Sequence, residues 1–372
     1  MEHDKIMEKI TIHASKEYDI IIENGLLSKA GTEIAKALPG AGRLCVVCDR
    51  TVHRLYGSED SPLQASLAAG GFELCTCVLQ GGETGKNITS VSMITDFLAA
   101  NHFTRSDAVI ALGGGITGDL AGFAASIYMR GIRFIQIPTT LLAMADSSVG
   151  GKTGANTEAG KNIIGTFWQP ELVIVDPEVL DTLPKKELLN GLAEIIKSGF
   201  IGDETIFDSI SDGLLPAVAK AINVKRLIVE EDERETGRRR LLNFGHTIGH
   251  AIEKCSNYKI SHGNAVMTGM YLATLAAEAK GWCKMPDRSA DSCPCAEPMS
   301  RYIKKVIEAF AYPVITKYSA DELAAVALND KKRDGEDIII IYPVGPGNCQ
   351  MKALPQKDLA SFIDLGLARA KL

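Results

Sequence analysis

The chain has 372 residues, of which 46% are hydrophobic and 23% charged; this is globular composition with enough length for two domains. Its 40 basic and 46 acidic residues give a net charge of −6, which argues against general nucleic-acid binding but leaves an anionic small substrate open. No apolar run reaches the roughly 18 residues of a membrane helix and no secretory signal is recognised, so we expect a cytoplasmic protein with reduced cysteines.

The first half of the sequence alternates short β-rich runs with helical patterns, which predicts a parallel sheet with helical crossovers. Cys45 and Cys48 are spaced like a redox or zinc pair, but their apolar run favours a structural role in a buried strand. The expected strands are Leu44–Cys48, Phe72–Leu79, Ala108–Leu112, Phe134–Ile137 and Leu172–Val175. The expected helices are Gly25–Ala37, Pro62–Ala69, Ser90–Ala100 and Gly118–Tyr128.

The second half, from Lys185 onward, has helical periodicity almost throughout. Pro184 is the expected hinge, which predicts an α/β domain over residues 1–184 and a mainly helical domain over residues 185–372. One strand pair is expected around Ile338–Tyr342 and Cys349–Lys352, and Cys283–Pro298 is expected to be an inserted surface loop. The expected helices are Lys186–Phe200, Asp203–Ser211, Leu214–Glu230, Asn243–Lys254, Gly263–Lys280, Met299–Ala309 and Ala320–Leu328.

Two glycine-rich turns follow predicted strands. Gly113–Asp119 follows one strand and opens a helix, where backbone N–H groups can approach a pyrophosphate; the alternative is a tight strand-to-helix turn. Gly81–Lys86 is a second turn of this kind. Asp49, at the end of the first predicted strand, has the position of an acid that binds a ribose hydroxyl, or it only caps a turn.

Asp146–Gly154 and Gly160-Lys161-Asn162 are interpreted as one long polar loop between the two halves. Glycine-rich backbone with lysine suits phosphate or carboxylate, and the alternative is a solvated linker. Arg130 ends a predicted helix, where the simpler role is a helix C-terminal charge.

The chain has 7 histidines, and His246, His250 and His262 lie close together in sequence. His246 and His250 are spaced to share a helix face, and imidazole can hold a metal or move protons. Glu194 either pairs with Lys197 on one helix face or joins the histidines, because one carboxylate and two imidazoles are typical of catalytic zinc. The arginine-rich run Glu233–Arg240 is a solvated face, or one of its arginines binds a carboxylate.

Together these motifs resemble the 3-dehydroquinate synthase family, one of the sugar phosphate cyclases, over nearly the whole chain. The resemblance is carried by Gly113–Asp119, Pro138–Leu142, Asp146–Gly154, Gly160–Asn162, Ala193–Lys197, Asn243–Glu253 and Asp330–Lys332. It implies a Rossmann-like N-terminal domain that binds NAD and a mainly helical C-terminal domain that carries a divalent metal, usually zinc, with Co²⁺ as the alternative. A homodimer is expected, although the sequence itself leaves the oligomeric state open.

The resemblance also implies a role for each matching residue. Glu194, His246 and His262 would hold the metal, and His250 would transfer protons on the substrate. The substrate pocket would be lined by Arg130, Asp146, Lys152, Asn162, Lys197, Lys225, Arg239 and Asn243, and Lys331 or Lys332 would close over it. NAD would be contacted by Asp49, Glu83, Lys86, Gly114, Gly115, Ile116, Thr117, Gly118, Asp119, Thr139, Thr140, Lys152, Lys161 and Thr182.

The implied reaction converts 3-deoxy-D-arabino-heptulosonate 7-phosphate, a small sugar phosphate, to 3-dehydroquinate and phosphate in the shikimate pathway. It combines transient oxidation by NAD, β-elimination of phosphate, re-reduction and an intramolecular aldol closure. The alternatives are another sugar phosphate cyclase, a metal-dependent glycerol or alcohol dehydrogenase, and an inactive nucleotide- or metal-binding protein.

Overall fold

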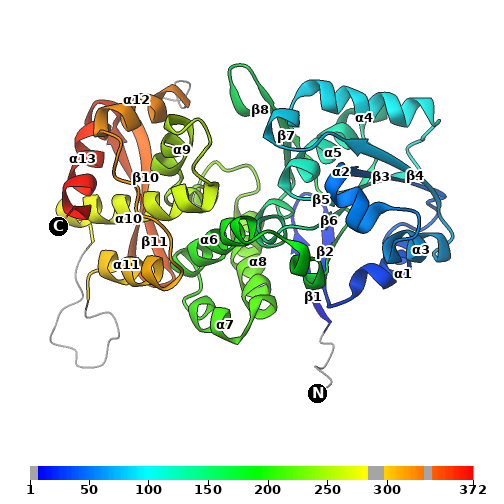
Figure 1. Cartoon of the computed structure of the whole chain (residues 1–372), viewed down its shortest axis with the longest axis horizontal. Helices are drawn as coiled ribbons and strands as arrows, with labels where there is room; N and C mark the ends of the chain where they lie inside the picture. Colours follow the sequence, from blue (N-terminus) through cyan, green and yellow to red (C-terminus); the bar gives the residue numbers. More distant parts are fainter. Residues whose placement is uncertain (1–6, 284–296, 331–336, 372) are drawn as a thin grey trace. The chain divides into compact units, whose positions relative to one another are not determined.

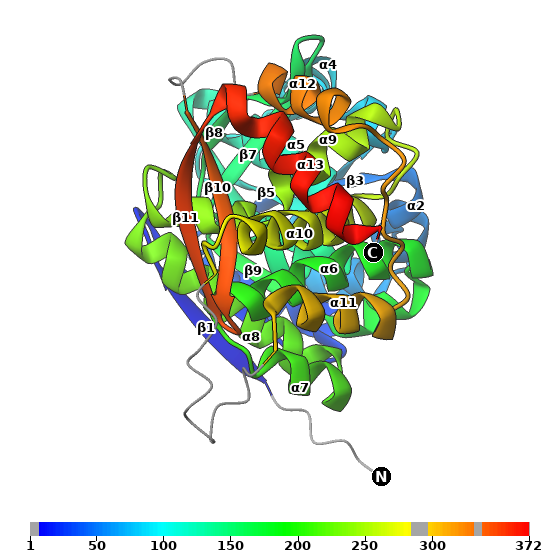
Figure 2. The ribbon, with the colours of Figure 1, turned by 90° about the vertical axis from the view of Figure 1, so that its left-hand side faces the viewer.

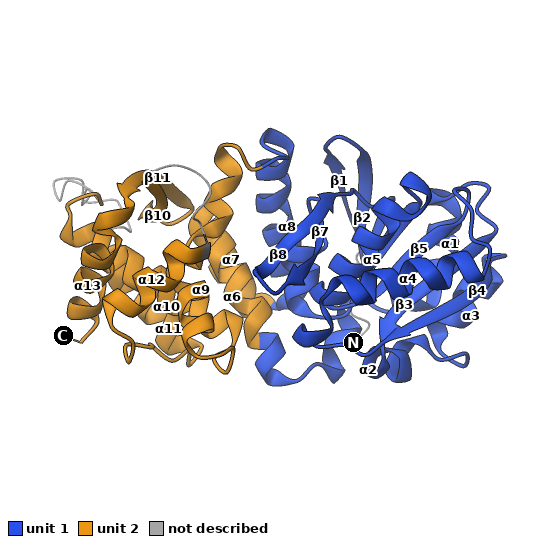
Figure 3. Cartoon of the chain, turned by 90° about the horizontal axis from the view of Figure 1, so that it is seen from above, with its two compact units in different colours: residues 1–188, 213–234 blue, residues 189–212, 235–372 orange. Residues whose placement is uncertain are grey.

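The computed structural model describes residues 7–283, 297–330 and 337–371. These residues form two compact units, coloured separately in Figure 3. Unit 1 comprises residues up to Leu188 together with Gly213–Arg234, and unit 2 comprises Leu189–Asp212 and Glu235 onward. The expected division into domains 1–184 and 185–372 stays a prediction; by compactness, residues 213–234 group with the first unit.

Unit 1 is built on a seven-stranded sheet of order β1-β2-β9-β6-β5-β3-β4. The strands from β2 to β4 in this order are parallel to their neighbours, and only β1 pairs antiparallel, with β2. The predicted parallel sheet is therefore confirmed, while β1 and β2 had no counterpart among the predicted strands. The strands are β1 Glu8–His13, β2 Glu17–Ile22, β3 Arg43–Asp49, β4 Glu73–Leu79, β5 Ala108–Gly113, β6 Arg133–Pro138 and β9 Leu172–Val175.

Helices cover both faces of this sheet (Figure 1). The chain moves outward from β3 to β4 but then inward to β5 and β6, so right-handed crossovers place α3 opposite α4 and α5. Val91 and Ile94 of α4 and Leu120 of α5 pack with Val109 of β5 in a buried core. The helices of unit 1 are α1 Ala30–Ala37, α2 Arg50–Val52, α3 Pro62–Ala69, α4 Ile88–Ala100, α5 Gly115–Ile127 and α8 Leu214–Glu231.

The prediction of one long polar loop over Asp146–Gly154 and Gly160–Asn162 is wrong in part, because much of this segment forms an antiparallel hairpin. Strand β7 (Lys152–Thr157) pairs with β8 (Gly160–Phe167). The two backbones approach closely at Gly154 and Gly165, since a Cβ at Gly165 would lie 2.0 Å from the Thr153 carbonyl oxygen. Ala155 is buried in the core with α5. Glycine and polar residues at most positions hid the strand period from the sequence.

Unit 2 is mainly helical, with one antiparallel strand pair, as predicted. Figure 2 shows β10 and β11 beside α10 and α13, and Ile338, Leu354, Leu272 and Phe362 share their core. Helix α6 (Lys185–Ile201) begins at the end of unit 1 and runs into unit 2. The other elements are α7 Ile206–Asp212, α9 His246–Cys255, α10 His262–Ala279, α11 Met299–Ala309, α12 Ala320–Asp330, β10 Asp337–Gly345, β11 Asn348–Pro355 and α13 Leu359–Ala370.

The structural role predicted for Cys45 and Cys48 is confirmed. Both are fully buried in β3 and neither is in a disulfide. Burial raises the pKa of the Cys48 thiol to about 12, which makes it a poor nucleophile and metal ligand. Most of Cys283–Pro298, as well as Lys331 and Lys332, lies outside the described residues. Within the described residues, every helix is too short or too polar to cross a membrane.

Candidate functional site

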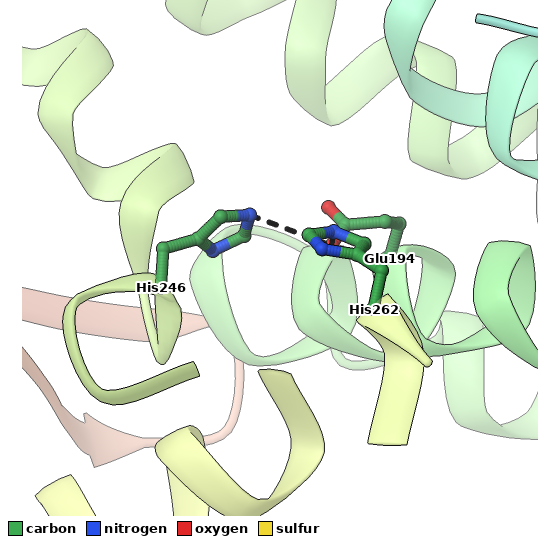
Figure 4. A group of neighbouring side chains, drawn as sticks. All are labelled: Glu194, His246 and His262. Atoms are coloured by element: carbon green, nitrogen blue, oxygen red, sulfur yellow. Dashed lines mark ion pairs between the residues drawn. The ribbon is translucent and has the colours of Figure 1, made fainter. Parts of the chain in front are cut away.

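Three helix positions of unit 2 bring a carboxylate and two imidazoles together (Figure 4). Glu194 lies within α6, while His246 and His262 are the first residues of α9 and α10. Gly245 precedes His246 with φ +79°, and a Cβ there would lie 2.5 Å from Cγ of Met270. Only glycine combines this left-handed backbone with such close contact to α10, so Gly245 sets where α9 begins.

The donor atoms of this cluster have the spacing of a metal site. The Oε1 atom of Glu194 lies 3.6 Å from Nε2 of His246 and 3.3 Å from Nε2 of His262. Ligand atoms around a tetrahedral zinc, with bonds of about 2.0–2.2 Å, lie roughly 3.4 Å apart. The same Oε1 atom is buried without a hydrogen bond, as expected of an oxygen that faces a cation.

The remaining nitrogen of each histidine is held by an acceptor of the protein. Nδ1 of His246 lies 3.1 Å from the Phe244 carbonyl oxygen, and Nδ1 of His262 lies 3.2 Å from Oε2 of Glu253. Both acceptors favour a hydrogen on Nδ1, so in the neutral form of each ring Nε2 is the nitrogen that carries the lone pair. Carboxylate and carbonyl partners of this kind are usual behind metal-bound histidines.

The pKa values of His246 and His262 are shifted in opposite directions. Burial lowers the pKa of His246 well below its ordinary value, and the Lys197 charge adds to this effect. Burial also opposes charge on His262, but the neighbouring carboxylates of Glu194 and Glu253 raise its pKa to about 10. Burial alone would raise the pKa of Glu194, whereas Lys197 and the two histidines hold it well below its ordinary range. The cluster without metal therefore holds an ionised carboxylate, one neutral imidazole and one imidazolium.

His250 lies one helical turn beyond His246 and is the more accessible ring. Its side chain is 51% exposed, against 13% for His246. The ring centroids of His250 and His246 are 5.1 Å apart, and Nε2 of His250 lies 4.0 Å from Oε2 of Glu253. His250, Glu253 and His262 form a second group with metal-like spacing, but Glu253 already holds Nδ1 of His262. An exposed imidazole beside the ligands suits proton transfer.

Three more predicted site residues lie in unit 2. Lys197 forms a buried ion pair with Glu194, so the pairing weighed from helical spacing is present together with the histidine cluster. Asn243 donates from Nδ2 to Oε1 of Glu235 at 2.6 Å. Arg239 is 1% exposed, and its Nε atom is buried without a hydrogen bond. A buried guanidinium suits an anionic group better than the solvated face that most of such a run forms.

In unit 1 the first glycine-rich turn lies where the strand order reverses, between β3 and β5. This is the usual place for ligands in open α/β sheets. Helix α5 starts after Gly114 without a side-chain cap, so backbone N–H groups of its first turn are available to an anion. A Cβ at Gly115 would lie 2.9 Å from Oγ of Ser147, and one at Gly118 would lie 2.8 Å from Oε1 of Gln136. The turn is thus both tightly packed and suited to phosphate.

The second glycine-rich turn contacts the β7–β8 hairpin and α5. The buried Lys86 ammonium donates to Oδ1 of Asn162 at 2.6 Å and forms an ion pair with Asp119. Glu83 lies 3.4 Å from the Lys161 ammonium. These five residues, which the sequence spreads over three segments, form two polar groups that Asn156 joins.

Other predicted residues of unit 1 have local partners. Asp49 accepts from the backbone N–H groups of Thr51 and Val52 and so caps α2, which is the alternative weighed from sequence; its ribose role stays a prediction. Lys225 pairs with Asp146 at 2.6 Å. Thr140 accepts from Ala143 N, Thr139 N donates to the Gly113 carbonyl, and Thr182 contacts Tyr56 Oη. Arg130 and Lys152 are exposed, and Ile116 and Thr117 belong to the first turn of α5.

Sequence reasoning missed two residues that the structure places in these networks. Glu253 holds His262, and its spacing three residues after His250 on the same helix was an available signal. Asn156 contacts both Glu83 and Asn162, and it had no local signal because its partners lie elsewhere in the chain.

Comparisons with known proteins show the family of this chain. Residues 76–190 match the family described as 3-dehydroquinate synthase N-terminal, and residues 191–333 match 3-dehydroquinate synthase C-terminal. The 3-dehydroquinate synthase of Alkaliphilus metalliredigens is 40% identical over 96% of this chain and 98% of its own length. The enzyme of the same name from Streptococcus gordonii is 41% identical over 93% of this chain and 96% of its own length.

Solved structures share the fold. A 2-epi-5-epi-valiolone synthase from Streptomyces hygroscopicus, with NAD⁺ and Zn²⁺ bound, has a TM-score of 0.80 at 29% identity and covers 98% of this chain and all of its own (100%). A 2-deoxy-scyllo-inosose synthase with carbaglucose-6-phosphate, NAD⁺ and Co²⁺ has a TM-score of 0.80 at 23% identity and covers 96% of this chain and 99% of its own. At this identity the match supports a shared fold only. Family matches across both halves and relatives at about 40% identity place the chain in the 3-dehydroquinate synthase family.

Proposed function

We propose that this chain is a 3-dehydroquinate synthase, which converts 3-deoxy-D-arabino-heptulosonate 7-phosphate to 3-dehydroquinate and phosphate. The observation that carries the proposal is the Glu194, His246 and His262 cluster with both Nδ1 atoms already held by acceptors. It lies in a chain whose relatives of that name match over nearly all of its length. The substrate is thus a small sugar phosphate.

NAD and a divalent metal are the proposed cofactors, with Zn²⁺ first and Co²⁺ as the alternative. When bound, NAD would accept and return a hydride while the metal polarises substrate oxygens. Glu194, His246 and His262 would hold the metal, because one carboxylate and two neutral imidazoles leave open positions for a substrate. The cofactor would be held by the α5 first turn and by the Asp49, Glu83, Lys86, Thr139, Thr140, Lys161 and Thr182 segments.

The remaining proposed site residues bind anions or move protons. Lys152, Asn162, Arg130 and Arg239 are donor types that hold phosphate and carboxylate. The Lys197 ammonium is already fixed by Glu194, so it is oriented before substrate arrives. The exposed His250 ring would exchange protons with the substrate and with solvent. The proposed substrate pocket also includes Asp146, Lys225 and Asn243.

Phosphate release tests the substrate. The purified protein with NAD and Zn²⁺ is offered 3-deoxy-D-arabino-heptulosonate 7-phosphate, glucose 6-phosphate or sedoheptulose 7-phosphate. We expect phosphate release from the heptulosonate only, together with formation of 3-dehydroquinate. Release only from either of the other sugars would assign the chain to another branch of the sugar phosphate cyclases.

Absorbance of NADH during turnover separates a cyclase from a dehydrogenase. A butanol dehydrogenase from Thermotoga maritima shares the fold with a TM-score of 0.64 at 15% identity. A dehydrogenase accumulates NADH, whereas the cyclase regenerates NAD in every turnover, so we expect no net change at 340 nm.

We also propose that the protein is a homodimer and that it is located in the cytoplasm. Light scattering after size exclusion tests the homodimer, and cell fractionation tests the location.

A further inference from the structure

Asn156 lies at an irregular position of the β7–β8 hairpin. The pairing register shifts between Ala155 and Thr157, so Asn156 falls outside the hairpin's own ladder. Its backbone pairs instead with the second glycine-rich turn: Asn156 N donates to the Lys86 carbonyl at 2.8 Å, and Asn156 forms a parallel bridge with Asn87. The bulge thus attaches the hairpin to a segment about 70 residues earlier in the chain.

The Asn156 side chain uses both ends of its amide. Its Nδ2 donates to Oε1 of Glu83 at 2.8 Å, and its Oδ1 accepts from the backbone N–H of Asn162 at 2.9 Å. Asn162 has φ +54°, a left-handed conformation that residues other than glycine rarely adopt. The hydrogen bond that the Asn162 N–H donates to Asn156 therefore helps to hold Asn162 in a conformation that its own backbone disfavours.

A second connection joins the same two segments. The Lys86 ammonium donates to Oδ1 of Asn162 at 2.6 Å, and Lys161 lies 3.4 Å from Glu83. Asn156 is distinct because one uncharged side chain contacts both segments at once. A carboxylate in its place could accept from Asn162 but could not donate to Glu83.

We propose that Asn156 is a positioning residue that couples the Glu83–Lys86 turn to the Lys161–Asn162 turn. The identity of the ligands rests on the proposed function, in which the first turn contacts NAD and Asn162 contacts the substrate. Asn156 then holds the substrate donor Asn162 in a fixed position against the cofactor turn. Its loss should raise the KM for substrate more than it lowers kcat, because Asn162 binds substrate rather than reacting with it.

The experiment compares Asn156→Ala, the isosteric Asn156→Asp, and the double variant Asn156→Asp with Glu83→Gln. The double variant exchanges the amide and the acid, so the hydrogen bond can re-form with its polarity reversed. Thr157→Ala is the matched control, because the Thr157 hydroxyl accepts only a turn hydrogen bond from Ala159 N among the contacts described for it. Circular dichroism and melting temperature confirm folding of each variant before use.

The first measurement needs no ligand. Hydrogen exchange of peptides covering residues 160–165, which include the Asn162 N–H and exclude the Ala159 N–H, reports this hydrogen bond. We expect exchange about tenfold faster in Asn156→Ala, unchanged in Thr157→Ala, and close to wild type in Asn156→Asp, which keeps the acceptor. Equal exchange in wild type and Asn156→Ala would overturn the proposal.

The second measurement follows NAD and substrate. We expect Asn156→Asp to raise the Kd of NAD about tenfold, because a carboxylate then faces Glu83. The double variant should lose less NAD affinity than the sum of the losses in Asn156→Asp and Glu83→Gln measured singly. In Asn156→Ala the KM for substrate should rise about tenfold, with kcat within about threefold of wild type. Because Glu83 is itself a proposed NAD contact, Glu83→Gln is also measured alone, and additive effects of the two substitutions on the Kd of NAD contradict the coupling. Failure of wild type to release phosphate would count against the proposed function, while the exchange result still decides the role of Asn156.

Discussion

Nδ1 of His262 lies 3.2 Å from Oε2 of Glu253, a buried carboxylate that holds the ring from the side opposite Glu194. This relationship orients Nε2 toward Glu194 and raises the basicity of the imidazole. Glu253 therefore belongs to the site through its contact with Nδ1 of His262, although in sequence it follows His250 by three residues.

Glu253→Gln should weaken metal binding by about 10- to 100-fold without abolishing it, because an amide oxygen accepts the Nδ1 hydrogen less strongly than a carboxylate. Zinc affinity is measured by competition with a chromophoric chelator. Glu308→Gln, which changes an exposed acid on α11, is the control and should bind zinc like wild type. Unchanged affinity in Glu253→Gln would remove Glu253 from the metal site.

His246→Ala and His250→Ala should have different effects. His246→Ala removes a ligand, so the purified protein should lose its metal and all activity. His250→Ala should keep one metal per chain while turnover falls about 100-fold or more, as for loss of a general acid or base. Metal content is read by elemental analysis alongside phosphate release. If His250→Ala lost zinc as His246→Ala does, the division of roles would be wrong.

Zinc binding should release about one proton near pH 7.5. His262 has a pKa of about 10 without metal and is therefore charged at this pH, whereas His246 has a lowered pKa and is already neutral. Zinc must displace the proton of His262, so affinity should rise with pH until about pH 10, where His262 loses it. Calorimetry in buffers of different ionisation enthalpy measures the release, and a heat independent of buffer would contradict it.

Lys86→Met should lower the free energy of unfolding by about 2 kcal/mol, because it leaves Asp119 without its charged partner in a largely buried site. The side chains of Lys86 and Asp119 are 8% and 20% exposed. Lys36→Met is the control; the Lys36 side chain is 66% exposed in its pair with Glu33, and its loss should cost less than about 0.5 kcal/mol. Urea unfolding measures the free energy of unfolding of both variants. Equal losses in the two variants would show that the buried pair does not stabilise the fold more than the exposed pair.

The sequence by itself determined the elements whose side chains follow a strong period. The apolar strand around Val46, the helix that carries His246 and His250, and the glycine-rich turn after β5 all have local signals, because burial and backbone conformation act on neighbouring residues. The family resemblance added roles for single residues, which still await the experiments above. The β7–β8 hairpin was missed since its glycines and polar residues follow no period.

Only the tertiary structure decided which atoms meet. Helical spacing pairs His246 with His250, yet the Nε2 atoms nearest Glu194 belong to His246 and His262. Ring orientation depends on what holds Nδ1, which is a carbonyl for His246 and Glu253 for His262. Likewise Asn156 gains its two contacts from segments far away in sequence. Hydrogen bonds between distant segments leave no periodic trace, because they depend on how whole elements pack rather than on neighbouring residues.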